Sequence, residues 1–383
     1  MKFFRNILDK AAPKFEKGGK LEKYYPIYEM ADTFMFTPAD VTEKGPHVRD
    51  SVDLKRSMII VVLAMLPAFF FGLFNIGYQE DASRSIIENM LIGLYATLPI
   101  LLVSYGVGGL WEVIFAVVRK HEINEGFLVT GFLIPMIVPP TTPLWMVAVA
   151  TSFGVVIGKE IFGGTGYNIF NPALVTRAFL FFAYPSAISG DSVWTIVDGV
   201  SKATPLAVAA ASEDVGGVTA LIQNNYSFAE LFYGFVPGSI GETSTLAILI
   251  GAFILIITKV ANWRIMAGIM IGMTGIALLT NLLAGVSTNP MMDLTPQYHF
   301  VLGGFAFGMV FMATDPVSAS QCDAGRWIYG ILVGALVVVI RSMNPAFPEG
   351  MMLAILLGNA FSPMIDYIIV RKHIKRRQNR YAQ

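Results

Sequence analysis

A short polar stretch near the middle of the chain holds the residues best suited to covalent chemistry. Residues 198–204 read DGVSKAT and end in the hydroxyl of Thr204, which small side chains precede and Pro205 follows. The residue before a proline favours an extended backbone, so we expect the Thr204 hydroxyl to be exposed and open to modification. An ordinary surface turn is the alternative, because threonine is common in such turns.

Acidic side chains inside or beside apolar segments form a second group of candidates. They are Glu112, Glu160, Asp315, Glu349 and Asp366. Oxygen ligands of this kind suit hard cations. Asp315 and Glu349 each lie next to a proline, so we expect them to line a pathway rather than to face lipid. Glu160 follows Lys159, which favours an ion pair at the membrane rim, and a structural role is the alternative for the other acids.

The composition is that of a membrane protein. The chain has 383 residues, of which 55% are hydrophobic and 14% charged, and its mean hydropathy is +0.61. Soluble domains have about 25% charged residues. The single cysteine, Cys322, excludes an internal disulfide and a multi-cysteine cluster within the chain. The N-terminus lacks the apolar core of a signal peptide. The net charge of zero indicates nothing about partners, and we expect no nucleic-acid partner.

Apolar segments predict an all-α polytopic membrane protein with about ten transmembrane helices. A crossing needs about 20 apolar residues. The expected segments are 57–75, 90–118, 127–139, 143–161, 171–190, 245–260, 265–283, 301–313, 327–340 and 350–370. This pattern predicts a basic arm (1–56), a first five-helix repeat (57–190), a loop that carries Thr204 (191–244), a second five-helix repeat (245–370) and a basic tail (371–383).

The basic residues predict the orientation. If the ten segments alternate, one side receives 23 of the 27 Lys and Arg residues, and the other side receives Arg84, Lys202 and Arg341. Loops rich in Lys and Arg face the cytoplasm. We therefore expect both termini in the cytoplasm and Thr204 on the outer face.

Two segments, 127–139 and 301–313, are too short to cross as simple helices. Thirteen residues extend about 20 Å as a helix, against a hydrocarbon core of about 30 Å. Each segment is third in its group of five, and an odd number of helices relates two such groups by inversion. We expect two inverted repeats whose broken third helices line a central site. Ordinary turns between helices are the alternative.

Long stretches of the sequence resemble the NqrB family, one of the membrane subunits of the sodium-translocating NADH:quinone oxidoreductases. The matching stretches are VGGLWEV (107–113), GGTGYNIFNPAL (163–174), RAFLFFAYP (177–185), PGSIGE (237–242), FMATDPVSAS (311–320) and NPAFPEGMM (344–352). Matches run in order from about residue 24 to the C-terminus, so the resemblance is specific. It implies a redox subunit of a sodium pump in a bacterial inner membrane.

The resemblance implies a covalent flavin. In that family, and in the RnfD component of the related Rnf complex, FMN is joined through its phosphate to a threonine in the motif Asp-x-x-Ser/Thr-x-Ala-Thr/Ser. Asp198, Ser201, Ala203 and Thr204 match this motif, whereas Lys202 stands where the family more often has glycine. That departure concerns the local turn rather than the acceptor. A flavin transferase outside the cytoplasm is implied as the modifying enzyme.

A second redox group is expected in the membrane, because one electron step cannot cross a bilayer. The resemblance implies a non-covalent riboflavin, and the candidates are Gly164, Gly166, Asn168, Asn171 and Arg177. Glycines permit close backbone approach, asparagine amides match the polar edge of the flavin ring, and an intramembrane arginine is usually functional. A re-entrant turn whose asparagines satisfy backbone groups is the alternative.

The quinone and sodium sites are also implied by the resemblance. Gly108, Gly109 and Glu112 lie near the cytoplasmic end of a segment, where the family binds quinone; plain helix packing through glycine is the alternative. Asp315, Glu349, Asp366 and Glu160 are the candidates for the sodium pathway, and no permanently bound metal is expected.

The resemblance further implies a complex of six subunits. One partner carries FMN on the outer side, and another holds NADH, FAD and an iron–sulfur cluster, since this chain has no dinucleotide-binding fingerprint. Membrane lipid surrounds the helices. Two alternatives are the RnfD component of an Rnf complex and a secondary transporter or channel with inverted repeats, which would have no use for Thr204.

Overall fold

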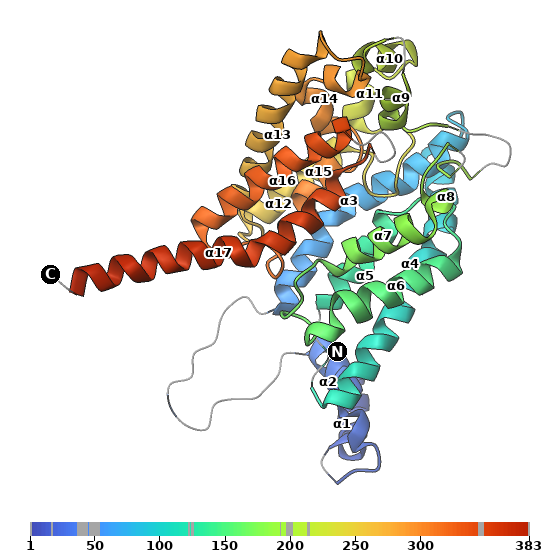
Figure 1. Cartoon of the computed structure of the whole chain (residues 1–383). Coiled ribbons are helices and arrows are strands. Elements are labelled where there is room, and N and C mark those ends of the chain that lie inside the picture. Colours follow the sequence, from blue (N-terminus) through green and yellow to red (C-terminus); the bar gives the residue numbers. More distant parts are fainter. Residues whose placement is uncertain are drawn as a thin grey trace.

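The computed structural model is helical throughout the part of the chain that it describes. The described residues are 2–16, 18–36, 45, 54–121, 123, 126–191, 193–196, 202–212, 215–343 and 348–381. Within these ranges there is no strand. Figure 1 shows the N-terminal helices α1 (Lys2–Phe15) and α2 (Tyr25–Met35) at one end of the molecule and the short helices α9 (Pro205–Ala211), α10 (Gly217–Gln223) and α11 (Phe228–Tyr233) at the other.

Apolar helices coincide with the expected segments. The first group is α3 (Leu54–Glu80), α4 (Ile86–Arg119), α5 (Gly126–Met136), α6 (Leu144–Gly158) and α7 (Pro172–Ala183), followed by one turn, α8 (Pro185–Ile188). The second group is α12 (Thr245–Ile257), α13 (Trp263–Ala284), α14 (Pro296–Val301), α15 (Phe305–Phe307), α16 (Asp323–Met343) and α17 (Met351–Tyr381). Six described helices are long and apolar enough to cross a membrane. The all-helical, multi-pass prediction is confirmed, and the count of ten crossings stays a prediction.

The third segment of each group is interrupted, as the sequence predicts. Helix α5 has only 11 residues and contains Pro135. Its counterpart is broken between α14 and α15, where Gly303 adopts a φ of +58° that suits glycine, and it continues into a π-helical turn at Gly308–Met312. Both interruptions expose backbone groups inside the helical bundle, which need partners there.

Part of the packing of the first group recurs in the second, although the close packing of α3 on α4 is not repeated between α12 and α13. Helix α4 packs on α6 as α13 packs on α16, α6 packs on α7 as α16 packs on α17, and α3 packs on α5 as α12 packs on α15. Equivalent helices also meet across the centre, α3 with α12 and α7 with α17. This recurrence supports two structural repeats, whereas their expected boundaries stay predictions.

The long break between the two groups is more ordered than the sequence predicts. Instead of a plain polar loop it contains α9, α10 and α11, which enclose a small apolar core of their own with α14. Lys202 connects this unit to the first group, because its Nζ donates to the carbonyl oxygen of Gln79 (2.8 Å) at the end of α3. Thr204 is therefore held against the bundle.

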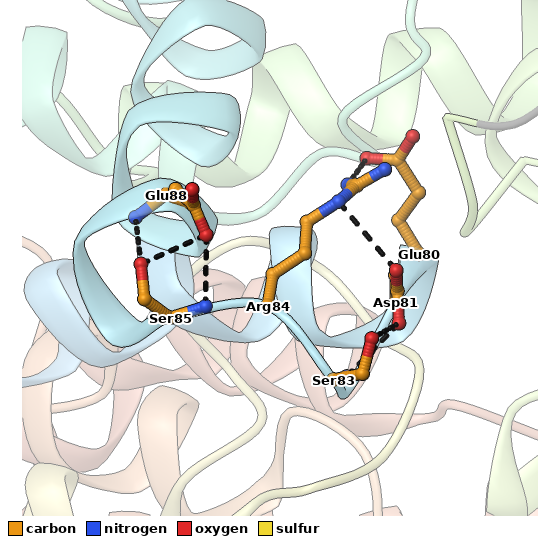
Figure 2. A network of polar contacts seen from close by, with 6 residues as sticks. All are labelled: Glu80, Asp81, Ser83, Arg84, Ser85 and Glu88. Carbon is orange, nitrogen blue, oxygen red and sulfur yellow. Dashed lines mark hydrogen bonds and ion pairs between the residues drawn. The ribbon is translucent and has the colours of Figure 1, made fainter.

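A compact polar turn joins α3 to α4 (Figure 2). The Ser85 hydroxyl accepts from the Glu88 amide, and the Glu88 carboxylate accepts from the Ser85 amide, so a capping box starts α4. Arg84 pairs with Glu80 at 2.7 Å. The hydroxyl and amide of Ser83 both donate to Asp81, which lowers the pKa of that exposed carboxyl.

Candidate functional sites

Thr204 occupies the N-cap of α9. Its backbone is extended (φ −65°, ψ 151°), as expected before Pro205, and its Oγ1 accepts from the amide of Ala207 at 3.2 Å. The side chain is partly exposed. The carbonyl of Ala203 accepts from the Tyr226 hydroxyl at 3.1 Å, whereas the other two motif residues, Asp198 and Ser201, lie outside the described residues. The hydroxyl is thus accessible and fixed in direction.

Two cavities open beside Thr204. The larger has a volume of about 320 Å³ and is lined by Arg177, Phe181, Trp194, Glu349 and small residues of α9. The smaller, of about 30 Å³, lies between Thr204, Glu242 and Gly303. A buried guanidinium and aromatic rings next to a reachable hydroxyl fit a phosphate-linked aromatic group, because phosphate needs cationic donors and the ring needs flat apolar walls.

A third cavity, of about 580 Å³, contains Asn168 and Asn171 together with Asp315. Both asparagines are largely buried. Asn168 donates from its Nδ2 to the carbonyl of Phe170 at 2.9 Å, and the Asn171 Oδ1 caps α7 by accepting from Ala173 at 3.0 Å. The helix cap uses only the Oδ1 of Asn171 and not its Nδ2 group. The amide groups in this cavity can therefore match the donors and acceptors at the polar edge of a flavin ring. The residues present fit a non-covalent flavin.

Three of the five riboflavin candidates lie away from that cavity. Gly164 and Gly166 flank Thr165, which lines the cavity, but do not line it themselves, and their φ values of +96° and +91° suit glycine in the turn before α7. Arg177 donates to the Ser239 hydroxyl (3.4 Å) and lines the cavity of Thr204 instead. The position of Arg177 in the other cavity does not follow from its closeness to Asn171 in sequence, because the two side chains are about 1.7 turns of α7 apart and point in different directions.

Charged side chains also gather on the α4–α6 side of the asparagine cavity. The Lys159 ammonium, which lines the cavity, donates to Glu112 and lies 3.8 Å from the carboxylate of Glu160. Arg119 approaches Glu160 to 3.5 Å and donates to its carbonyl at 2.7 Å. The expected rim pair of Lys159 and Glu160 therefore belongs to a larger network, and it is buried, since Glu160 is only 1% exposed.

The two glycines before Glu112 have different surroundings. A side chain on Gly108 would collide with the ring of Phe127, at 2.0 Å from Cζ. Gly109 has no atom within 4 Å of where a Cβ would be and faces outward. Gly108 thus serves close packing, whereas the space beside Gly109 is not filled by any described residue.

The four sodium candidates lie in separate places. Asp315 accepts from the Val317 amide (3.1 Å) and the Ser318 hydroxyl (2.8 Å) in the asparagine cavity. Asp366 caps the turn before α16, accepting from the Ser320 hydroxyl and the amides of residues 321 and 322. Glu160 belongs to the lysine network and Glu349 to the Thr204 end. They do not form one site.

Glu349 belongs to a buried charged group that sequence reasoning missed. Its carboxylate accepts from the amide of Gly304, and Glu242 approaches the same glycine. The charge distribution predicts Arg341 in an outer loop, but it lies in the last turn of α16 with no exposed surface and donates to the carbonyls of His299, Leu302 and Glu349. Glu242 could have been found from its position, because an acidic residue just before an apolar segment is unusual enough to be a candidate.

The comparisons with known proteins agree with this architecture. The sequence model of the NQR2, RnfD, RnfE family matches residues 41–375. A protein of Ectopseudomonas mendocina is 53% identical over 400 residues, covering 97% of this chain and 98% of its own. One from Chromohalobacter salexigens is 52% identical over 403 residues, covering 99% and 97%. Both are named as the B subunit of a Na(+)-translocating NADH-quinone reductase. The chain belongs to the NQR2, RnfD, RnfE family.

Proposed function

We propose that this chain is the membrane redox subunit of a sodium-translocating NADH:quinone oxidoreductase. Thr204 would hold a covalent FMN, Asn168 and Asn171 a riboflavin, and the surface near Gly109 a quinone, and together these groups would carry electrons from FMN via riboflavin to quinone. The observation that carries the proposal is the pair of cavities at Thr204 and at the two asparagines, in a chain whose full-length relatives bear that name.

The residues at Thr204 suit attachment and retention of a flavin phosphate. The α9 cap holds the hydroxyl in one direction, and Pro205 keeps the preceding backbone extended. Arg177 presents a guanidinium in the same cavity, where it would offset the negative charge of a phosphodiester. Trp194 adds an apolar wall that excludes water from the ring. FMN supplies the one- and two-electron chemistry.

Residues of the asparagine cavity bind and orient the second flavin. Asn168 and Asn171 are fixed by hydrogen bonds to the backbone around residues 170–174, so their remaining amide groups are pre-oriented. Phe311 offers an aromatic wall, and the ammonium of Lys159, paired with Glu112, lies at the edge of the cavity as a hydrogen-bond donor. Riboflavin again supplies the redox chemistry.

The orientation and the partners follow from the same proposal. The termini lie in the cytoplasm, the Thr204 end faces the outside of a bacterial inner membrane, and the 371–383 tail adds to the positive inner side. Electrons reach Thr204 from an FMN-bearing outer subunit, and NADH oxidation occurs on a subunit with FAD and iron–sulfur chemistry. A flavin transferase attaches the FMN, and Asp315, Glu349, Asp366 and Glu160 contribute to sodium passage.

A denaturing gel tests the flavin assignment. Wild-type protein, expressed in a host with the flavin transferase, is expected to give a fluorescent band under ultraviolet light. Thr204→Ala removes the acceptor oxygen and is expected to abolish the band, whereas Thr195→Ala, a matched change in the same segment, is expected to retain it. A wild-type protein without fluorescence would contradict the proposal and favour a transporter. Co-purifying NADH dehydrogenase activity distinguishes this complex from an Rnf complex.

A further inference from the structure

We propose that Glu242, Thr243 and Glu349 form a binding site for a single sodium ion beside Thr204. The site lies where the loop before α12 meets the break between α14 and α15. The site rests on the proposed function for the identity of the ion. It deepens that function, because it joins one pathway candidate, Glu349, to two residues that were not among the candidates from the sequence.

The three residues line one small cavity. Glu242, Thr243 and Glu349 all line the cavity of about 30 Å³. A Cβ placed on Gly304 would lie 3.0 Å from Glu242 Oε1 and 3.0 Å from Glu349 Oε1. These two oxygens therefore flank Gly304 and lie no farther apart than twice that distance.

Two of these oxygens have no partner among the described residues. Glu242 Oε1 and Thr243 Oγ1 are both buried without a hydrogen bond, and their residues are only 6% and 7% exposed. Buried polar atoms are nearly always satisfied by protein, water or an ion. Two unsatisfied buried oxygens on adjacent residues that line one cavity therefore point to a ligand that binds both.

The neighbouring arginines do not neutralise the two carboxylates directly. Arg341 donates to three carbonyl oxygens, and Arg177 donates to the Ser239 hydroxyl. In the described part of the chain, neither guanidinium lies within ion-pair distance of Glu242 or Glu349. Two close carboxylates repel each other, and a bound cation or a shared proton relieves that repulsion.

The cavity and the hydroxyl favour the cation over the proton. A proton shared between Glu242 and Glu349 would leave Thr243 Oγ1 unsatisfied, whereas a hard cation uses carboxylate and hydroxyl oxygens together. A cavity needs roughly 10–15 Å³ to hold one water molecule. With about 30 Å³, this one has room for an ion and at most a further water. Both glycines, Gly303 and Gly304, keep that space open, since a side chain on either would press on a carboxylate.

Sodium titrations of the intact complex test the site. The thermal unfolding midpoint is followed against NaCl at constant ionic strength in choline chloride, with KCl in parallel, and the same samples give the sodium dependence of quinone reduction. Thr243→Val removes one oxygen at nearly constant shape. It is expected to raise the half-saturating sodium concentration about tenfold in both measurements, the scale of one hydrogen bond to a charged group. Thr243→Ser is expected to stay near wild type.

Thr151→Val provides the matched control. Thr151 is a fully buried threonine of α6 whose hydroxyl is also unpartnered, but it lies away from the cavity, so its sodium dependence should be that of wild type. If the Thr243→Val variant fails to assemble, Glu242→Gln tests the site instead. It is expected to weaken sodium binding more than Thr243→Val does. Unchanged sodium dependence in both folded variants would overturn the site.

Other outcomes are equally informative. A variant that alters the pH profile and not the sodium titration would point to a shared proton and overturn the site as well. Fluorescence of the same samples on a denaturing gel keeps the two proposals separate. Loss of the wild-type band contradicts the flavin assignment without affecting the sodium titration of the unfolding midpoint, and an unresponsive midpoint contradicts the sodium site without affecting the band.

Discussion

The two ends of the bundle hold their buried charges in different ways. Near the asparagine cavity, Lys159 pairs with Glu112 and Arg119 with Glu160, so cations and anions meet through side chains. Near Thr204, Arg341 binds backbone carbonyls and Glu349 binds a backbone amide. The first arrangement neutralises itself, whereas the second leaves carboxylate oxygens available. The difference indicates that an added cation is stabilised more at the Thr204 end than near the asparagine cavity.

The largest loss of stability is expected when Arg341 is replaced, and it tests whether this end relies on backbone groups rather than on ion pairs. Arg341→Met leaves three buried carbonyls without their donor and should reduce the free energy of unfolding by on the order of 5 kcal/mol. Denaturation of the purified complex measures it. Because Arg341 binds backbone rather than an acid, adding Glu349→Gln is not expected to restore stability; recovery in the double variant would mean that the two side chains form an ion pair after all.

A smaller but rescuable loss is expected at the opposite end. Lys159→Met leaves Glu112 without its cation and should cost about 3–5 kcal/mol, since breaking a buried pair is costly. Lys159→Met combined with Glu112→Gln removes both charges, and most of that loss should be regained. The same denaturation series measures both variants. A double variant as unstable as the single one would show that the pair does not neutralise itself.

The smallest expected effect concerns the caps. Ser85→Ala removes the capping box of α4 and should cost about 1 kcal/mol, seen as faster amide exchange in the first turn of that helix. Ser227→Ala removes the equivalent box of α11. Because α11 is a six-residue helix, the change should spread through the whole of it, whereas the long α4 should loosen only at its end. Equal spread in both helices would contradict this.

Much of the architecture can be predicted from the sequence, because membrane helices are set by local apolar runs. The apolar pattern predicts a helix over 90–118, where α4 spans Ile86–Arg119, and it predicts that α5 is short. The order within 191–244 cannot be predicted this way. Helices α9 to α11 are too short to show an apolar period and are stabilised by their mutual core, which depends on contacts with α14.

Residues of the candidate sites can be predicted from the sequence only where a short local motif contains them. Thr204 is accessible, and Asn168 and Asn171 share a cavity, as a local motif can indicate. Arg177 and Glu242 meet the Thr204 end through contacts of residues far apart in sequence, so neither spacing nor periodicity indicates them. The burial of Arg341 could not be predicted, because a basic residue directly after an apolar segment looks like a loop cation, although here carbonyls of a broken helix accept its hydrogen bonds.

The hydrogen bond from Lys202 to the end of α3 restrains the backbone that leads to Thr204. Lys202 stands two residues before Thr204, and its ammonium satisfies the carbonyl of Gln79, one of the last carbonyls of α3. A glycine at that position could offer no such tether. A group carried by Thr204 would therefore swing through a narrower arc, and its distance to the next acceptor would vary less. Because electron tunnelling falls steeply with distance, this tether would make the first transfer step more uniform.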